Sequence, residues 1–89
     1  MHLLCGKCKE IVEKAIGAMP EDLSCAAAVA GIVAAIELAG GGPEDPVADA
    51  LAAVAAAVVE EECEKHGWPW IHSHGKEIAE AMCQAAKLC

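Results

Sequence analysis

Six cysteines are the residues of this chain with the clearest chemical capacity. A thiolate can attack a substrate, bind a metal or pair into a disulfide. An even number of cysteines in a chain of 89 residues favours a disulfide framework, and therefore an oxidising, extracellular compartment. Two cysteines open the chain as a CxxC motif, two close it, and two lie between. They are Cys5, Cys8, Cys25, Cys63, Cys83 and Cys89.

The segment Cys5-Gly-Lys-Cys8 also resembles a redox dithiol, because a helix N-terminus and Lys7 would both stabilise a thiolate. Thioredoxin-like chemistry expects a βαβ unit, which the sequence does not predict. A helical peroxidase-type site expects a histidine after the second cysteine, where Val12 stands. Redox catalysis is therefore the third hypothesis, and we expect no enzymatic activity.

Three histidines, His66, His72 and His74, flank the only aromatic segment and follow Cys63. Three imidazoles and a thiolate are a ligand set for zinc or copper. Their spacing matches no familiar metal motif, so we expect a polar loop with no cofactor and keep the three histidines as weak metal candidates.

The aromatic segment itself is Trp68-Pro69-Trp70-Ile71. One interpretation is that a tryptophan plugs the end of a bundle of small side chains. The other is an exposed anchor at a membrane interface, where tryptophan is favoured. We expect Trp68, Trp70 and Ile71 to contact a membrane or a partner.

Four helical segments are predicted to position these residues, at about 5–19, 22–39, 45–66 and 73–89, and no strand is predicted. Asp22 and Ser73 are the expected N-caps of the second and fourth, and Pro46 stands in the first turn of the third. Apolar residues of the first segment recur at helical spacing on one face. They are Cys8, Ile11, Val12, Ala15, Ile16 and Met19.

The second and third segments are apolar nearly all round, with no charge over 25–36 or 50–59. Each uncharged run is shorter than the ~20 residues that span a bilayer. We expect a buried central hairpin, with insertion into a membrane as the alternative. The chain is 56% hydrophobic but has no Phe or Tyr, so its small side chains bury little surface, and covalent bridges would stabilise the fold.

The net charge is −8, from 14 acidic residues and six lysines. Nucleic acid is excluded as a partner, because neutralising phosphates requires a basic surface. Anionic lipid is disfavoured for the same reason. An acidic cluster around Glu60–Glu64 ends the third segment, where it opposes the helix dipole and indicates a solvated end, a site for cations or a basic partner.

Helix lengths favour one of the fifteen possible disulfide connectivities. In an antiparallel hairpin, Cys25 and Cys63 lie ~21 and ~26 Å from the turn, at ~1.5 Å per residue, and so nearly level. Antiparallel terminal helices would then pair Cys5 with Cys89 and Cys8 with Cys83. The spacing at the two ends differs, so we expect a frayed or bent terminus.

The leading CxxC, the closing pair and two inner cysteines resemble the saposin order, which implies a compact lipid-interacting helical bundle. A nearer resemblance is to halocin-type bacteriocins, carried by Cys5-Gly-Lys-Cys8-Lys9, by the Ala/Gly-rich run after Cys25, and by the ending 81–89. Cys25 and Cys63 are farther apart than in saposins, and the halocin pattern has more cysteines.

We therefore expect a single all-α domain, 1–89: a compact, disulfide-stapled, saposin-like bundle of four to five helices. The halocin resemblance implies a secreted antimicrobial, the mature product of a longer precursor. It would act on the membrane or envelope of competing cells and have an immunity protein as a further partner. The alternative is a non-lytic saposin-like module that binds lipid or metal.

Overall fold

The computed structural model describes residues 2–41 and 44–89, and in this part of the chain every regular element is a helix. Met1, Gly42 and Pro43 lie outside the described residues, so the expected central turn is described only as far as Gly41. The helices are α1 (His2–Gly17), α2 (Cys25–Ala39), α3 (Pro46–His66), α4 (Trp68–Ser73) and α5 (Gly75–Ala85).

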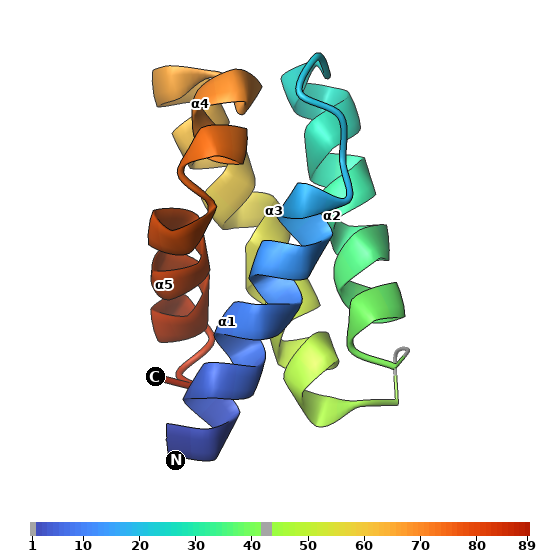
Figure 1. Cartoon of the computed structure of the whole chain (residues 1–89), viewed down its shortest axis with the longest axis vertical. Helices are drawn as coiled ribbons and strands as arrows, with labels where there is room; N and C mark the ends of the chain where they lie inside the picture. Colours follow the sequence, from blue (N-terminus) through green and yellow to red (C-terminus); the bar gives the residue numbers. More distant parts are fainter. Residues whose placement is uncertain (1, 42–43) are drawn as a thin grey trace.

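The four long helices run alternately up and down in a bundle of 32 × 21 × 18 Å. Figure 1 shows α1 beside α5 and α2 beside α3, with the two termini at the same end of the bundle and α4 at the other. The expectation of an all-α bundle of four to five helices is confirmed.

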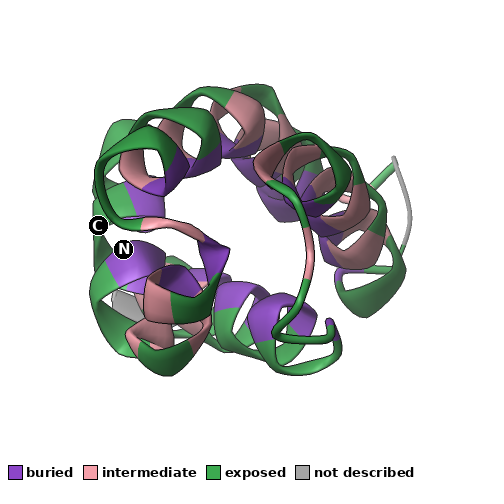
Figure 2. Ribbon diagram, turned by 90° about the horizontal axis from the view of Figure 1, so that it is seen from above, coloured by how far each residue is buried: buried purple, intermediate pink, exposed green. Residues whose placement is uncertain are grey.

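The core lies inside the ring of helices, and the buried positions face inward in the end-on view of Figure 2. Every residue of the predicted stripe is buried, and the last of them, Met19, lies just after the end of α1. Ile78 and Met82 of α5 are buried as well, while Ala86 packs partly buried against the core. Among the described residues, Trp68 is the only aromatic side chain in this core of small aliphatic residues, and it is 1% exposed.

Two of the expected N-caps are wrong. Ser24, not Asp22, caps α2, and its hydroxyl accepts a hydrogen bond from the Ala27 amide at 3.2 Å. Ser73 does not cap α5; its hydroxyl donates to the Trp70 carbonyl at 3.0 Å, and α5 starts after His74. Asp22 and Ser24 are both suitable N-cap residues, so local sequence preference does not decide which of them caps α2. The choice depends on where the chain turns after the preceding helix.

The segment after Gly67 was predicted to be a break and contains the short helix α4. Gly67 has φ 87°, a left-handed conformation that favours glycine, and its amide donates to the Cys63 carbonyl at 2.8 Å to end α3. Pro69 stands in the first turn of α4, where a missing N–H leaves no hydrogen bond unmade. The result is a sharp turn that folds α4 over the end of the bundle.

The central hairpin buries only one side of each helix. Ala28, Ile32 and Ile36 are the buried residues of α2, whereas Ala26, Ala30 and other small residues are exposed on its outer side. None of the described helices is long and apolar enough to cross a membrane. The hairpin expected to be buried is thus buried on its inner side and exposed on its outer side.

Candidate functional site

All six cysteines are paired, and the pairs are those expected from the helix lengths. The bridges are Cys5–Cys89, Cys8–Cys83 and Cys25–Cys63, with Cα–Cα distances of 4.7, 6.0 and 5.9 Å. Cys5 and Cys8 thus pair with the far end of the chain and not with each other. The dithiol hypothesis lacks its free thiols in this state, and Cys63 is not available as a metal ligand.

A residue in the left-handed conformation accounts for the unequal spacing of the two cysteines at each end of the chain. Lys87 has φ 62°, and the Leu88 amide bonds back to the Cys83 carbonyl at 2.9 Å. This is the hydrogen bond of a Schellman-type helix end, and it reverses the chain after α5. The reversal carries Cys89 back to Cys5.

The bridges divide the bundle into two stapled helix pairs. The first pair is α1 and α5, joined directly by the Cys8–Cys83 bridge and, through the segment after α5, by the Cys5–Cys89 bridge. The second pair is α2 and α3, joined by the Cys25–Cys63 bridge. No disulfide joins one pair to the other. Outside the connecting segments, the two pairs are therefore held together by non-covalent contacts alone.

One ion pair links the two stapled pairs within residues 2–41 and 44–89. The Lys7 ammonium of α1 donates to Asp45 Oδ2 at 3.1 Å. The other carboxylate oxygen, Oδ1, accepts hydrogen bonds from the Val47 and Ala48 amides and caps α3. Hydrogen bonding from Lys7, followed by that from Val47, lowers the pKa of Asp45 below its ordinary value of 3.8.

At the other end of the bundle, α4 is tied to the segment that follows α1. Trp68 Nε1 donates to the Pro20 carbonyl at 2.7 Å. His72 Nε2 lies 2.9 Å from the Met19 carbonyl, and because a carbonyl only accepts, this nitrogen donates. These two contacts hold the two connecting segments together.

Two of the three residues expected to contact a membrane or a partner are buried in this fold. Trp68 is 1% exposed and Ile71 is fully buried, so both belong to the core in this fold. The interpretation of one tryptophan as a plug fits Trp68, because the small side chains around it leave room for an indole. Only Trp70 is partly exposed.

Trp70 lies between two imidazoles. The ring centroids of His66 and Trp70 are 3.9 Å apart, and those of Trp70 and His74 are 4.1 Å apart, both in stacked geometry. His74 Nδ1 donates to the Trp70 carbonyl at 2.8 Å, so this nitrogen carries the proton and cannot act as a base for the neighbouring Ser73.

The three histidines do not converge on one point. His66 and His74 stack on Trp70, whereas His72 bonds to Met19. In the described part of the chain, no group of three or more histidine, cysteine or acidic side chains could hold a metal ion.

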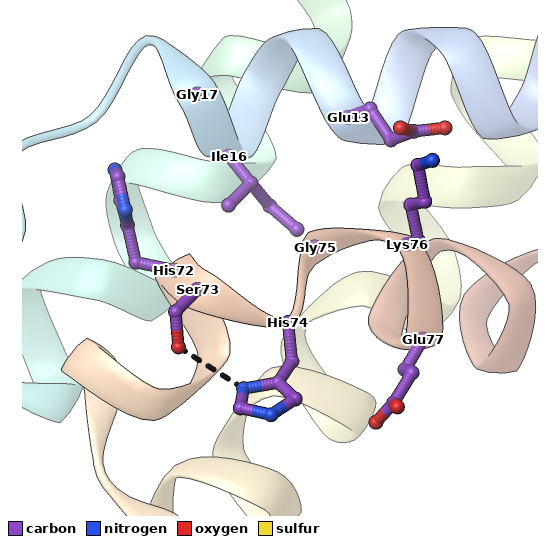
Figure 3. A pocket seen from close by; sticks show the side chains of 9 residues that line it. All are labelled: Glu13, Ile16, Gly17, His72, Ser73, His74, Gly75, Lys76 and Glu77. Carbon is purple, nitrogen blue, oxygen red and sulfur yellow. Dashed lines mark hydrogen bonds between the residues drawn. The ribbon is translucent and has the colours of Figure 1, made fainter.

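An open pocket of about 380 Å³ lies between α1 and the junction of α4 with α5 (Figure 3). Ile16 forms its floor, and Lys76 points toward α1 on the side where Glu13 lies, while His74 and Glu77 point away. Its charges are of both signs, so the pocket favours no one class of ligand. Sequence patterns do not predict this pocket, because its walls come from distant segments.

A second pocket, of about 310 Å³, lies on the outer side of the α2–α3 hairpin. We call it the hairpin groove. Its lining combines apolar atoms of α2 with two carboxylates of α3. The lining residues are Cys25, Ala26, Val29, Glu60 and Glu64. The sequence analysis identifies the acidic cluster. It does not predict that Glu60 and Glu64 lie on a different face of α3 from the other glutamates.

Comparison with protein-family models, curated proteins and solved structures finds no match for this chain. The functional argument therefore rests on the residues and their geometry.

Proposed function

We propose that this protein is a secreted, bacteriocin-like antimicrobial that acts on the membrane or envelope of competing cells. Three disulfides indicate an oxidising or extracellular environment. In the proposed mechanism the two stapled helix pairs separate at the membrane, and the α2–α3 hairpin turns its inner face toward lipid.

The observation that carries this proposal is the division of the disulfides. Each bridge lies within one helix pair, so the pairs can separate without breaking a covalent bond. The segments that would act as hinges are 18–24 and 67–74, which join the pairs. Opening requires loss of the Lys7–Asp45 ion pair at one end and of the Trp68–Pro20 hydrogen bond at the other.

Separation would make α2 apolar on both sides from Cys25 to Ile36. The inner face of α2 and α3 carries large aliphatic residues such as Ile32, Ile36 and Leu51, which are fully buried in the closed bundle. The outer side of α2 has no charge from Cys25 to Ile36. The free energy of burying this surface in lipid would offset the loss of the closed core.

The charge of the protein restricts the membrane it would attack. With a net charge of −8, it is repelled by anionic headgroups. We therefore expect leakage from zwitterionic vesicles at lower protein concentration than from vesicles rich in anionic lipid.

Dye release from vesicles, with growth inhibition beside it, tests the function, and a zero-length cross-link tests the opening. A carbodiimide joins the Lys7 ammonium to the Asp45 carboxylate that it contacts, which locks the two helix pairs together. Peptide mapping identifies the locked fraction. We expect the locked protein to release no dye.

Lys7→Arg is the matched control, because arginine keeps the charge but does not form this amide. After the same treatment, its other lysines are modified, and we expect it to retain dye release. Equal release from locked and control proteins would reject the opening. No release and no inhibition by the untreated protein would reject the antimicrobial function, and lipid binding without release would favour the non-lytic alternative.

A further inference from the structure

The acidic cluster at the end of α3 contains two glutamates that lie next to a basic side chain and two that, among the described residues, do not. Glu61 pairs with Lys65 at 3.4 Å, and Glu62 lies 3.7 Å from His66 Nε2, each at i,i+4 spacing along the helix. Glu60 and Glu64 make no ion pair with any described residue. The two unpaired carboxylates are those that line the hairpin groove.

Glu60 and Glu64 are themselves four residues apart, so they lie on one face of α3 as neighbours of like charge. Such a pair is unfavourable in an isolated helix, and a cation between the two carboxylates relieves the repulsion. Lysine and arginine side chains are the protein groups that supply this charge.

The opposite wall of the groove is apolar and fixed in position. Ala26 and Val29 of α2 lie near Cys25, whose bridge to Cys63 fixes this end of α2 against α3, with 5.9 Å between the Cα atoms of the two cysteines. Aliphatic stems of basic side chains can lie along such a wall while their charged ends reach the carboxylates.

The outer side of α2 extends this surface. Ala26, Ala30 and Ala34 are exposed at i,i+4,i+8 spacing, and small side chains allow a second helix to approach closely. Leu38, at the far end of α2, is 84% exposed. An apolar strip with two carboxylates at one end matches a helix that is apolar on one face and basic at one end.

We propose that the hairpin groove binds a basic amphipathic helix of a partner protein, with basic side chains at i,i+4 spacing against Glu60 and Glu64. Charge complementarity favours this occupant over an anionic bilayer, and helix-in-groove recognition supplies the apolar contact. The inference goes beyond the proposed function and does not depend on it, because the groove lies within one stapled pair and needs no opening.

The test uses a fluorescein-labelled synthetic helical peptide with lysines at i,i+4 spacing beside an alanine and leucine face, and fluorescence anisotropy with the full chain. The comparison peptide carries glutamine in place of each lysine. We expect binding of the lysine peptide and at least about fivefold weaker binding of the glutamine peptide.

Two pairs of matched variants separate the groove from the general acidity of the protein. The groove variant combines Glu60→Gln with Glu64→Gln. The control variant combines Glu13→Gln on α1 with Glu80→Gln on α5 and removes the same charge. We expect about five- to tenfold weaker peptide binding for the groove variant only. Ala26→Lys places a cation in the groove, and its control is Ala81→Lys on the exposed side of α5.

Equal weakening by groove and control variants would overturn the proposal in favour of unspecific attraction. Absence of binding by the lysine peptide would overturn it as well. Binding of zwitterionic vesicles that only the groove variants abolish, without peptide binding, would assign the groove to a membrane. Dye release plays no part in these measurements, so the two proposals fail independently.

Discussion

The carboxylate of Asp45 contacts both stapled helix pairs, one through each of its oxygens. Its Oδ2 accepts a hydrogen bond from the Lys7 ammonium of α1 at 3.1 Å, and its Oδ1 caps α3 through the Val47 amide at 2.8 Å. The capping of one helix is therefore linked to the attachment of another, and the charge of a single side chain influences both.

This link predicts a pH-dependent stability that Asp45→Asn removes. The pKa of Asp45 is lowered in the folded chain, first by the Lys7 hydrogen bond. The stabilisation is thus present above the ordinary value of 3.8 and is lost as the pH falls through the folded value. We expect the variant to unfold at lower urea concentration than the parent at neutral pH, and the difference to shrink as the pH falls below 3.8.

The control for this prediction is Asp49→Asn, in the first turn of the same helix but without an ion pair in the described residues. It loses only the favourable interaction of an acidic side chain with the helix dipole. A difference between Asp45→Asn and the parent that persists at low pH would assign the effect to side-chain shape instead of charge.

The parts of the fold that follow from helical periodicity were predictable. The stripe from Cys8 to Met19 gave the buried face of α1, and the level positions of Cys25 and Cys63 gave their pairing. The first inference uses only the turn of a helix, and the second adds to the helical rise the assumption that neighbouring helices pack antiparallel.

The features of the fold that were not predicted depend on contacts between segments far apart in the sequence. Trp68 was treated as a possible membrane anchor, but the Pro20 carbonyl, 48 positions away, holds its indole in the core. The ion pair between Lys7 and Asp45 spans 38 positions and has no local signal. The separation of Glu60 and Glu64 from the other glutamates of the cluster could have been predicted from the sequence. Their i,i+4 spacing places these two on one face of the helix.

The two nested disulfides are predicted to be energetically coupled. The Cys5–Cys89 and Cys8–Cys83 bridges span 84 and 75 positions, so either one alone closes nearly the same loop. In the chain-entropy model, removing one bridge by paired Cys→Ala substitution costs about 2–3 kcal/mol, and removing both costs about 7 kcal/mol. We expect the double removal to exceed the sum of the single ones by about 2 kcal/mol.

Guanidinium unfolding of the three variants measures this excess, and removal of the Cys25–Cys63 bridge is the comparison. That bridge spans 38 positions and lies well inside the loops that the other two close, so its own loop stays long when they are intact, and it is expected to contribute about 4 kcal/mol. Strictly additive costs of the nested bridges would show that strain or buried side-chain packing, and not loop closure, dominates. The fully buried Cys8 and Cys83 make the inner removal the costlier of the two.

Trp68→Phe is predicted to destabilise the closed bundle. The variant loses the indole N–H that donates to the Pro20 carbonyl and part of a side chain that is 1% exposed. We expect a loss of about 1–3 kcal/mol in the free energy of unfolding, measured by urea titration.

Trp70→Phe provides the control, because Trp70 is only partly buried and stacks between histidines at the surface. A loss below about 1 kcal/mol is expected for it. Acrylamide should quench the remaining Trp68 of this variant less than the remaining Trp70 of Trp68→Phe. The reverse order of quenching would contradict the burial of Trp68 and return it to the surface.

Two Gly→Ala substitutions are predicted to have opposite signs. At Gly40, a Cβ would lie 2.6 Å from the Ala48 Cβ and 3.1 Å from the Ile36 carbonyl oxygen, so α2 and α3 would have to move apart. At Gly6, in α1, a Cβ would meet nothing within 4 Å. Gly40→Ala should therefore destabilise by about 1–3 kcal/mol through overpacking, whereas Gly6→Ala should stabilise by about 0.5–1 kcal/mol through helix propensity.

Both glycine variants are measured by thermal and guanidinium unfolding with the disulfides intact, because reduction would add the loss of loop closure to the effect. A neutral Gly40→Ala would mean that the two helices of the hairpin separate at this point with little cost. The close approach of α2 to α3 would then rest on the Cys25–Cys63 bridge at the opposite end of the hairpin. Such a result would make the hairpin itself, and not only its junction with α1 and α5, a flexible part of the fold.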